Sequence, residues 1–145
     1  MVLECSSRGD IRFSAFGAYI TLFGKTDFIE NWYQTSKRFG NKIPKSWRDA
    51  KGKYCTHINI NGYDYNKKYL HDWYKILWCI YLDKNPNLIE YAKKFDDYRD
   101  FFKTKNGICQ ADVIRQYIKN GRSSIISDCS VFLNEIITNN KSRRE

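Results

Sequence analysis

Four polar residues at helical spacing are the clearest candidates for chemistry in this chain. Glu30, Tyr33, Gln34 and Lys37 occupy positions i, i+3, i+4 and i+7, so they share one face of a predicted helix. A carboxylate and an ammonium on one face suit a substrate that develops positive charge at a sugar carbon and carries phosphates. Solvent-facing helices often show the same pattern, and spacing alone leaves both interpretations open.

Basic residues near this helix are candidates for binding phosphate. Arg8 and Arg12 precede its start, where the backbone dipole also favours anions. Lys51 and Lys53 flank Gly52, and a basic loop of this kind can cradle phosphate. The chain has no G-x-x-x-x-G-K-[ST] pattern, and ordinary solvated side chains explain all four positions equally well.

The five cysteines predict neither a disulfide framework nor a metal site. They are widely spaced, odd in number and include no C-x-x-C motif. Cys55 and His57 could share a metal, but there is no second pair of ligands, and His71 is isolated. We therefore expect no metal and no cofactor.

The hydrophobic pattern predicts an α+β fold, mostly helical, with a small N-terminal sheet. Helices are expected over residues 27–40, 65–82, from Pro86 onward, 110–119 and 124–138, and strands within 11–23 and 55–60. Asp27 and Asn85 are the expected N-caps, and Gly40 and Gly121 the expected helix ends. We expect a single domain over residues 1–140 and a frayed basic tail over 141–145.

The composition indicates the kind of partner that the chain binds, and it argues against a membrane-spanning or a secreted protein. The 145 residues carry a net charge of +9, and residues 1–53 hold ten basic and five acidic side chains. This favours a polyanionic partner such as DNA, RNA or a nucleotide, although AT-rich codon usage explains part of the lysine excess. The longest apolar run has seven residues, too few for a membrane span of about 20. The start of the chain lacks the apolar core of a signal peptide, so we expect a cytoplasmic protein with no membrane partner.

The segment over residues 12–39 resembles the N-terminal signature of the NADAR family, the NAD- and ADP-ribose-associated N-glycosidases. That signature has an F-S-x-F segment, a glycine turn and a helix with Glu, an aromatic-Gln pair and Lys. The matching residues here are Phe13, Ser14, Phe16, Gly24, Lys25, Thr26, Glu30, Tyr33, Gln34 and Lys37. The family's later acidic and Trp-Gly elements have no clear match, and residues 106–112 are the nearest counterpart, with Gln110 and Asp112 as substitutes.

The resemblance implies a NADAR-like fold and a hydrolase that cleaves an N-glycosidic bond in an ADP-ribose-related or nucleotide substrate. Glu30 would stabilise charge or act as a base, and Lys37 would contact a phosphate or the leaving group. Trp32, Tyr33 or Trp47 would stack on the base. A modified base within DNA or RNA, extruded into the pocket, is a variant of the same substrate.

A second hypothesis is a protein without catalysis. The chain would bind a nucleic acid or a nucleotide as a phage accessory protein in a bacterial or infected cell. Its NADAR-like scaffold would then have lost the catalytic half, because a shared fold does not imply a shared activity.

Overall fold

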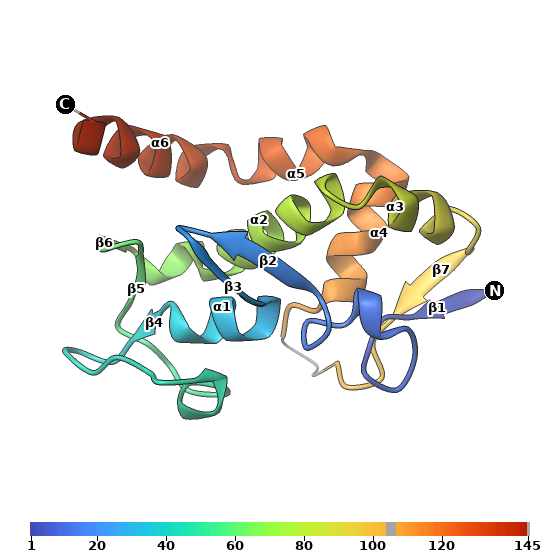
Figure 1. The fold of residues 1–145 in the computed structure, drawn as a ribbon, viewed down its shortest axis with the longest axis horizontal. Helices are drawn as coiled ribbons and strands as arrows, with labels where there is room; N and C mark the ends of the chain where they lie inside the picture. Colours follow the sequence, from blue (N-terminus) through green and yellow to red (C-terminus); the bar gives the residue numbers. More distant parts are fainter. Residues whose placement is uncertain (104–106, 145) are drawn as a thin grey trace.

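The computed structural model describes residues 1–103 and 107–144, which form an α+β fold (Figure 1). The helices in this part of the chain are Ile29–Thr35 (α1), Leu70–Asp83 (α2), Pro86–Ala92 (α3), Gln110–Asn120 (α4), Arg122–Asp128 (α5) and Ser130–Arg144 (α6). The strands are Val2–Glu4 (β1), Tyr19–Leu22 (β2), Lys25–Phe28 (β3), Lys37–Arg38 (β4), His57–Ile60 (β5), Tyr63–Tyr65 (β6) and Asp97–Arg99 (β7).

Helix α2 is the centre of the fold. Eight of its 14 residues are buried, and they lie on every side of the helix, as expected for a core helix. Helices α5 and α6 run along one side of α2, while α1 and the β2–β3 hairpin cover the other (Figure 1). The predicted helix over 65–82 is confirmed from Leu70 onward, and a 3₁₀ turn over Lys67–Tyr69 precedes it.

The strands form three small sheets in the described part of the chain. β2 and β3 make a hairpin, β4, β5 and β6 make an antiparallel sheet, and β1 pairs in parallel with β7. The expected N-terminal sheet is therefore only part of the β-structure. Residues Ile11–Phe13, expected in a strand, form a 3₁₀ turn because the Asp10 side chain accepts the backbone N–H of Arg12 and starts a turn.

The prediction of a helix over 27–40 is wrong at both ends. Asp27, the expected N-cap, lies in β3, and α1 begins at Ile29 with Phe28 as its N-cap residue. The helix then ends five residues before the predicted stop at Gly40. The Ser36 hydroxyl donates to the carbonyl of Tyr33, and the Arg38 guanidinium donates to the carbonyl of Thr35. These bonds satisfy carbonyls that a continuing helix would use. Lys37 then enters β4, where it pairs with Ile58.

The C-terminal region also differs from the prediction. A single helix over 124–138 was expected, but α5 and α6 are separate helices that break at Cys129. The break allows Ile125, Cys129 and Phe132, all fully buried, to face the core together. Residues 141–144 of the expected tail continue α6, and Glu145 lies outside the described residues.

The predicted start of α3 and the predicted end of α4 are confirmed, but Asn85 has a different role from the expected one. α3 begins at Pro86, and α4 ends before Gly121, whose positive φ of 89° suits glycine. Asn85 does not cap α3 with its side chain. Its amide donates instead to the carbonyl of Tyr81 at the end of α2.

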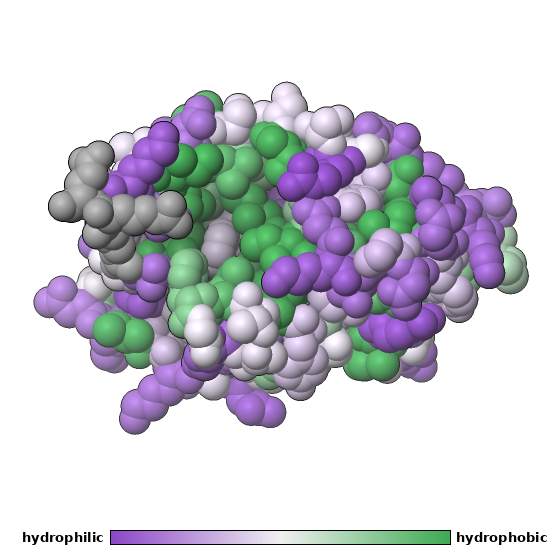
Figure 2. Space-filling view, turned by 45° about the horizontal axis from the view of Figure 1, so that its top comes forward, coloured by the Kyte–Doolittle hydropathy of each residue, from purple (hydrophilic) through white to green (hydrophobic). Residues whose placement is uncertain are grey.

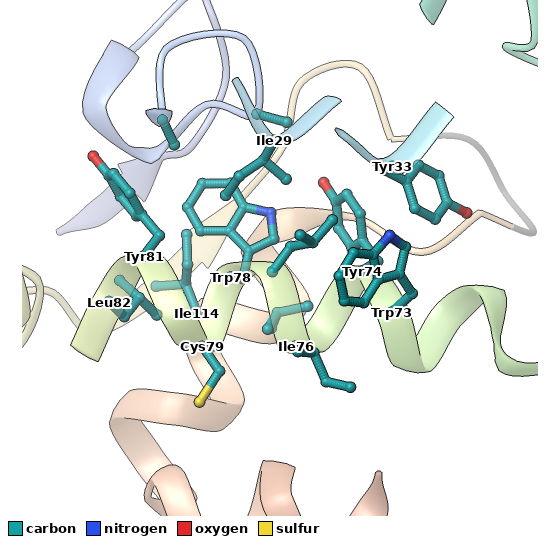
Figure 3. Packing of buried hydrophobic residues seen from close by; sticks show 14 of the residues in the cluster. Ile29, Tyr33, Trp73, Tyr74, Ile76, Trp78, Cys79, Tyr81, Leu82 and Ile114 are labelled. Atoms are coloured by element: carbon teal, nitrogen blue, oxygen red, sulfur yellow. The ribbon is translucent and has the colours of Figure 1, made fainter. Parts of the chain in front are cut away.

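The surface is polar over most of the face in Figure 2, but a hollow on that face has a hydrophobic floor. Among the described helices, none combines the length and the apolar composition needed to cross a membrane. Beneath the surface, α2 packs its aromatic and aliphatic side chains against Ile29 and Tyr33 of α1 (Figure 3).

We predict that Phe132→Ala lowers the free energy of unfolding by about 3–5 kcal/mol. The Phe132 ring is fully buried and stacks on Tyr69 with centroids 4.7 Å apart, so truncation leaves a cavity. The neighbouring Val131→Ala is the control, because Val131 is 66% exposed and its loss should change stability by less than about 0.5 kcal/mol. Urea unfolding measures both, and equal effects would contradict the packing described.

Candidate functional site

A cavity of about 510 Å³ lies between α1, the loop before β5 and the segment that leads into α4. Its wall combines parts of the chain that are far apart in sequence. The lining residues are Ser6, Ser7, Ser14, Ala15, Phe16, Glu30, Tyr33, Gln34, Lys37, Lys51, Gly52, His71, Tyr74, Asp100, Phe102, Lys103, Gly107, Ile108, Cys109 and Gln110. Six of the predicted site residues are among them: Glu30, Tyr33, Gln34, Lys37, Lys51 and Gln110.

Glu30 and Gln34 form a buried polar pair on α1. One helical turn separates them, and the Gln34 amide nitrogen donates to Glu30 Oε1 over 3.0 Å. Both are buried, at 7% and 5% exposed. Lys51 Nζ lies 3.7 Å from the same carboxylate oxygen. The Gln34 carbonyl oxygen has no hydrogen-bond partner within the described residues, so this wall presents an unused acceptor.

Lys37 reaches the cavity from β4 rather than from the predicted helix. Its ammonium lies 3.3 Å from the carbonyl oxygen of Ala50 and 3.4 Å from that of Lys53. Burial lowers the pKa of Lys37, while Cys55 and Glu30 act in the opposite direction. The two carbonyls hold the cation at the wall without neutralising it.

Aromatic and amide groups form the floor. The rings of Tyr33 and Tyr74 meet edge to face with centroids 4.8 Å apart. The Tyr74 hydroxyl donates to Gln110 Oε1 over 3.0 Å, and the Gln110 amide donates to the carbonyl of Cys5. Burial raises the pKa of Tyr74, so its phenol stays protonated and fixes the orientation of Gln110.

Asp100 is a site residue that sequence reasoning missed. Asp96, Asp97 and Asp100 are close together in the sequence, but their side chains have different surroundings, and Asp96 pairs with the N-terminal ammonium. Asp97 pairs with Arg115, whereas Asp100 lines the cavity. Burial raises the pKa of Asp100. The pairing of β1 with β7 places Asp100 there, and no local sequence pattern signals it.

Asp112, the predicted substitute for the family's acidic element, does not line the cavity. Its carboxylate accepts from Lys103 and from Arg115, each over 2.9 Å. It therefore neutralises neighbouring cations, one of which, Lys103, does line the cavity. Asn106, the first residue of the same segment, lies outside the described residues.

The two predicted arginine anchors also lie away from the cavity lining. The Arg8 guanidinium stacks 4.1 Å from the ring centroid of Phe101. Arg12 makes two bonds to Asp10, over 2.9 and 2.7 Å, and covers the Tyr91 ring. The bidentate ion pair explains why Arg12 is held by the protein itself.

The side chains of two more predicted site residues, Trp32 and Lys53, also lie outside the cavity lining. Trp32 faces the opposite side of α1, where its indole nitrogen donates to the carbonyl of Ile20 over 3.2 Å. Lys53 contributes its backbone carbonyl to Lys37, while its side chain is exposed. Helical spacing alone does not show which side of α1 meets the cavity.

Aromatic rings and cations also gather at the cavity mouth. The rings of Phe16 and Trp47 meet edge to face with centroids 5.0 Å apart. Lys51 lies over both rings, and Arg48 lies 4.8 Å from the Trp47 ring centroid. We call these four residues the mouth ridge. Its flat rings and its cations can contact a base and a phosphate.

Metal ligands do not cluster in this structure. Across residues 1–103 and 107–144, no three His, Cys, Asp or Glu side chains are close enough to hold an ion together. All five cysteines are buried, unpaired thiols.

The sequence matches no protein-family model and no curated protein. The chemistry available at the cavity therefore follows from its own groups. These are a buried carboxylate, an unpaired amide oxygen, three lysines and a second carboxylate whose pKa is raised by burial.

We predict that the difference in stability between the wild type and Lys37→Met changes with pH in the alkaline range. Because burial lowers the folded-state pKa of Lys37 below 10.5, the folded protein releases this proton before the unfolded chain does. The wild type should therefore gain stability over Lys37→Met as pH rises from the folded-state pKa toward 10.5, and the difference should be constant below that range.

Urea unfolding over the alkaline range measures this difference. Lys84→Met is the control, because Lys84 is exposed and its removal should leave the pH profile unchanged. Parallel profiles for the wild type and Lys37→Met would contradict a buried ammonium.

Proposed function

We propose that this protein is a hydrolase that cleaves an N-glycosidic bond in a nucleotide-type substrate. The observation that carries the proposal is the buried Glu30 carboxylate beside the unpaired Gln34 oxygen, in a cavity that also holds lysines. Both oxygens are acceptors, so they suit the hydroxyl groups of a ribose. The volume of about 510 Å³ falls within the range of small-ligand sites.

In the proposed reaction, water attacks the anomeric carbon while the bond to the base nitrogen breaks. The bonding electron pair leaves with the base, and positive charge develops on the sugar. Glu30 stabilises this charge and takes a proton from the attacking water. The departing base gains a proton, for which Asp100 is the proposed donor, since burial favours its protonated form.

The lysines complete the proposed arrangement. Lys51 is 54% exposed at the mouth and pairs with Glu30 only at 3.7 Å, so a substrate phosphate can attract it away from the carboxylate. Lys37 holds a positive charge deeper in the wall. The Tyr33 and Tyr74 rings offer apolar contact to the sugar or the base.

The resemblance over residues 12–39 supports the same proposal, and membership of the NADAR family is part of it. Glu30, Tyr33, Gln34 and Lys37 carry the resemblance, and all four line one cavity. The proposed substrates are ADP-ribose-related molecules, nucleotides, or modified bases in nucleic acid. Such substrates would place the reaction in the cytoplasm.

We predict that Glu30→Gln lowers the rate of base release by at least about a hundredfold, because the carboxylate charge is lost at the reacting carbon. The assay incubates the protein with NAD, ADP-ribosylated nucleic acid or modified-base DNA and detects the released base by mass spectrometry. Glu90→Gln is the matched control, because Glu90 is an exposed residue on α3. Release that is equally fast in Glu30→Gln would refute the catalytic role.

A second candidate is binding of single-stranded nucleic acid without catalysis, which the mouth ridge favours. Its aromatic pair can stack on bases and its two cations can contact phosphates. Under this candidate the cavity would hold one nucleotide, and Glu30 would only orient it.

We predict that Trp47→Ala weakens binding of single-stranded DNA by about fivefold or more, through loss of one stacking surface. Lys51→Gln should reduce the slope of log affinity against log salt by about one. Val131→Ala, on the far α6 surface, is the control. Affinity that is insensitive to salt would rule out this candidate, and base release by the wild type would favour the hydrolase.

A further inference from the structure

A second concave region lies on the opposite side of α1 from the candidate site. Its two parts have volumes of about 340 and 280 Å³. Leu22, Phe23, Ile60 and Trp73 line both parts, so they form one continuous depression. We call it the hairpin groove, because the β2–β3 turn forms one of its edges.

One end of the hairpin groove is apolar. Ile76 of α2, Ile126 of α5 and Leu133 and Ile136 of α6 line the part of about 280 Å³. This end lies between the hairpin and α5–α6, and it corresponds to the hydrophobic hollow in Figure 2. A hydrocarbon group that enters it leaves water, and that transfer is favourable.

Trp73, in the middle of the groove, carries an unused donor. The residue is only 4% exposed, and its indole nitrogen has no hydrogen-bond partner within the described residues. Trp32 beside it satisfies its own indole by donating to Ile20. A buried donor without a partner is unfavourable, so an acceptor on a bound molecule would be stabilising at Trp73.

Phe23 is strained at the edge of the groove. Its φ is 53°, a left-handed conformation that is rare for a bulky residue, and its ring is half exposed. The equivalent position of the β5–β6 turn holds Asn61 at φ 52°, and asparagine tolerates this conformation well. Strain of this kind concentrates where a ligand is held. The ring contacts Trp32 edge to face at 6.4 Å and covers the groove.

The other end of the groove is cationic. Lys25 and Arg38 line the part of about 340 Å³, and neither makes an ion pair within the described part of the chain. Burial lowers the pKa of Arg38, and Asp64 opposes this effect. At the apolar end, the carboxylate of Asp83 is already paired with Arg122 over 2.8 Å. The groove therefore complements a negative charge at one end only.

We propose that the hairpin groove binds a small anionic amphiphile, such as a fatty-acid carboxylate. Its hydrocarbon tail fills the apolar end, its head group accepts from the Trp73 indole, and its negative charge faces Lys25 and Arg38. The volumes are those of a site for one small molecule. A second copy of the chain is disfavoured as the occupant, because it would bring another net charge of +9.

The four tryptophans make the test specific. Trp32 and Trp73 line the groove, whereas Trp47 lies at the mouth ridge and Trp78 is fully buried in the core. Dodecanoate, kept below its micelle-forming concentration, is added to ¹⁵N-labelled protein and the indole N–H signals are followed by NMR. Tryptophan-to-phenylalanine variants assign the signals. We expect a saturable shift of the Trp73 signal and little change at Trp47.

Two variants with a matched control test the mode of binding. Lys25→Gln should weaken dodecanoate binding by about threefold to fivefold. Ile136→Gln should weaken it more, because a polar group enters the apolar end. Ile137→Gln, at the neighbouring 49% exposed position outside the groove lining, should have no effect.

Three results would overturn the proposal. These are the absence of saturable binding, equal binding of dodecyltrimethylammonium, which has the opposite charge, and shifts confined to Trp47. Because the groove is separate from the candidate site, Glu30→Gln should bind dodecanoate as the wild type does. The proposal therefore stands or falls independently of the proposed hydrolase.

Discussion

The burial of α2 on all sides is the constraint on which the rest of the structure depends. A helix with buried residues on every side must be covered from several directions, and the remaining elements provide that cover. The side chains of consecutive residues of α2 then point in different directions. Tyr74 extends to the floor of the candidate site, and Trp73 extends to the hairpin groove. One buried helix thus supports both cavities.

Helix α1 separates the two cavities, and its two sides have different chemistry. Glu30 and Gln34 lie on the side of the candidate site, while Trp32 faces the groove. Cations near this helix also differ in the cavity that they line. Lys37 and Lys51 are at the site, whereas Arg38, the next residue after Lys37, is at the groove, because successive strand residues point to opposite faces.

Much of the framework was predictable because strong helical periodicity in long segments reports burial directly. The segment over 70–83 and the Pro86 start of α3 are examples. The end of α1 was not predictable, since it depends on the Arg38 side chain bonding to the carbonyl of Thr35. Glu30 and Gln34 were correctly placed together by their spacing. Asp100 was missed, and Asp112 was preferred to it, because only strand pairing between distant segments decides which carboxylate reaches the cavity.

That pairing has a consequence for how the protein folds. β1 joins β7 across 95 residues, and the backbone N–H of Cys5 extends the pairing by donating to Arg99. Joining such distant segments requires closing a long loop, whose entropy must be offset before the contact is stabilising. Local helices and hairpins form their contacts first. The wall that contains Ser6, Asp100 and Gln110 is therefore expected to assemble late, after the helical core, so that the chain completes its candidate site in the last steps of folding.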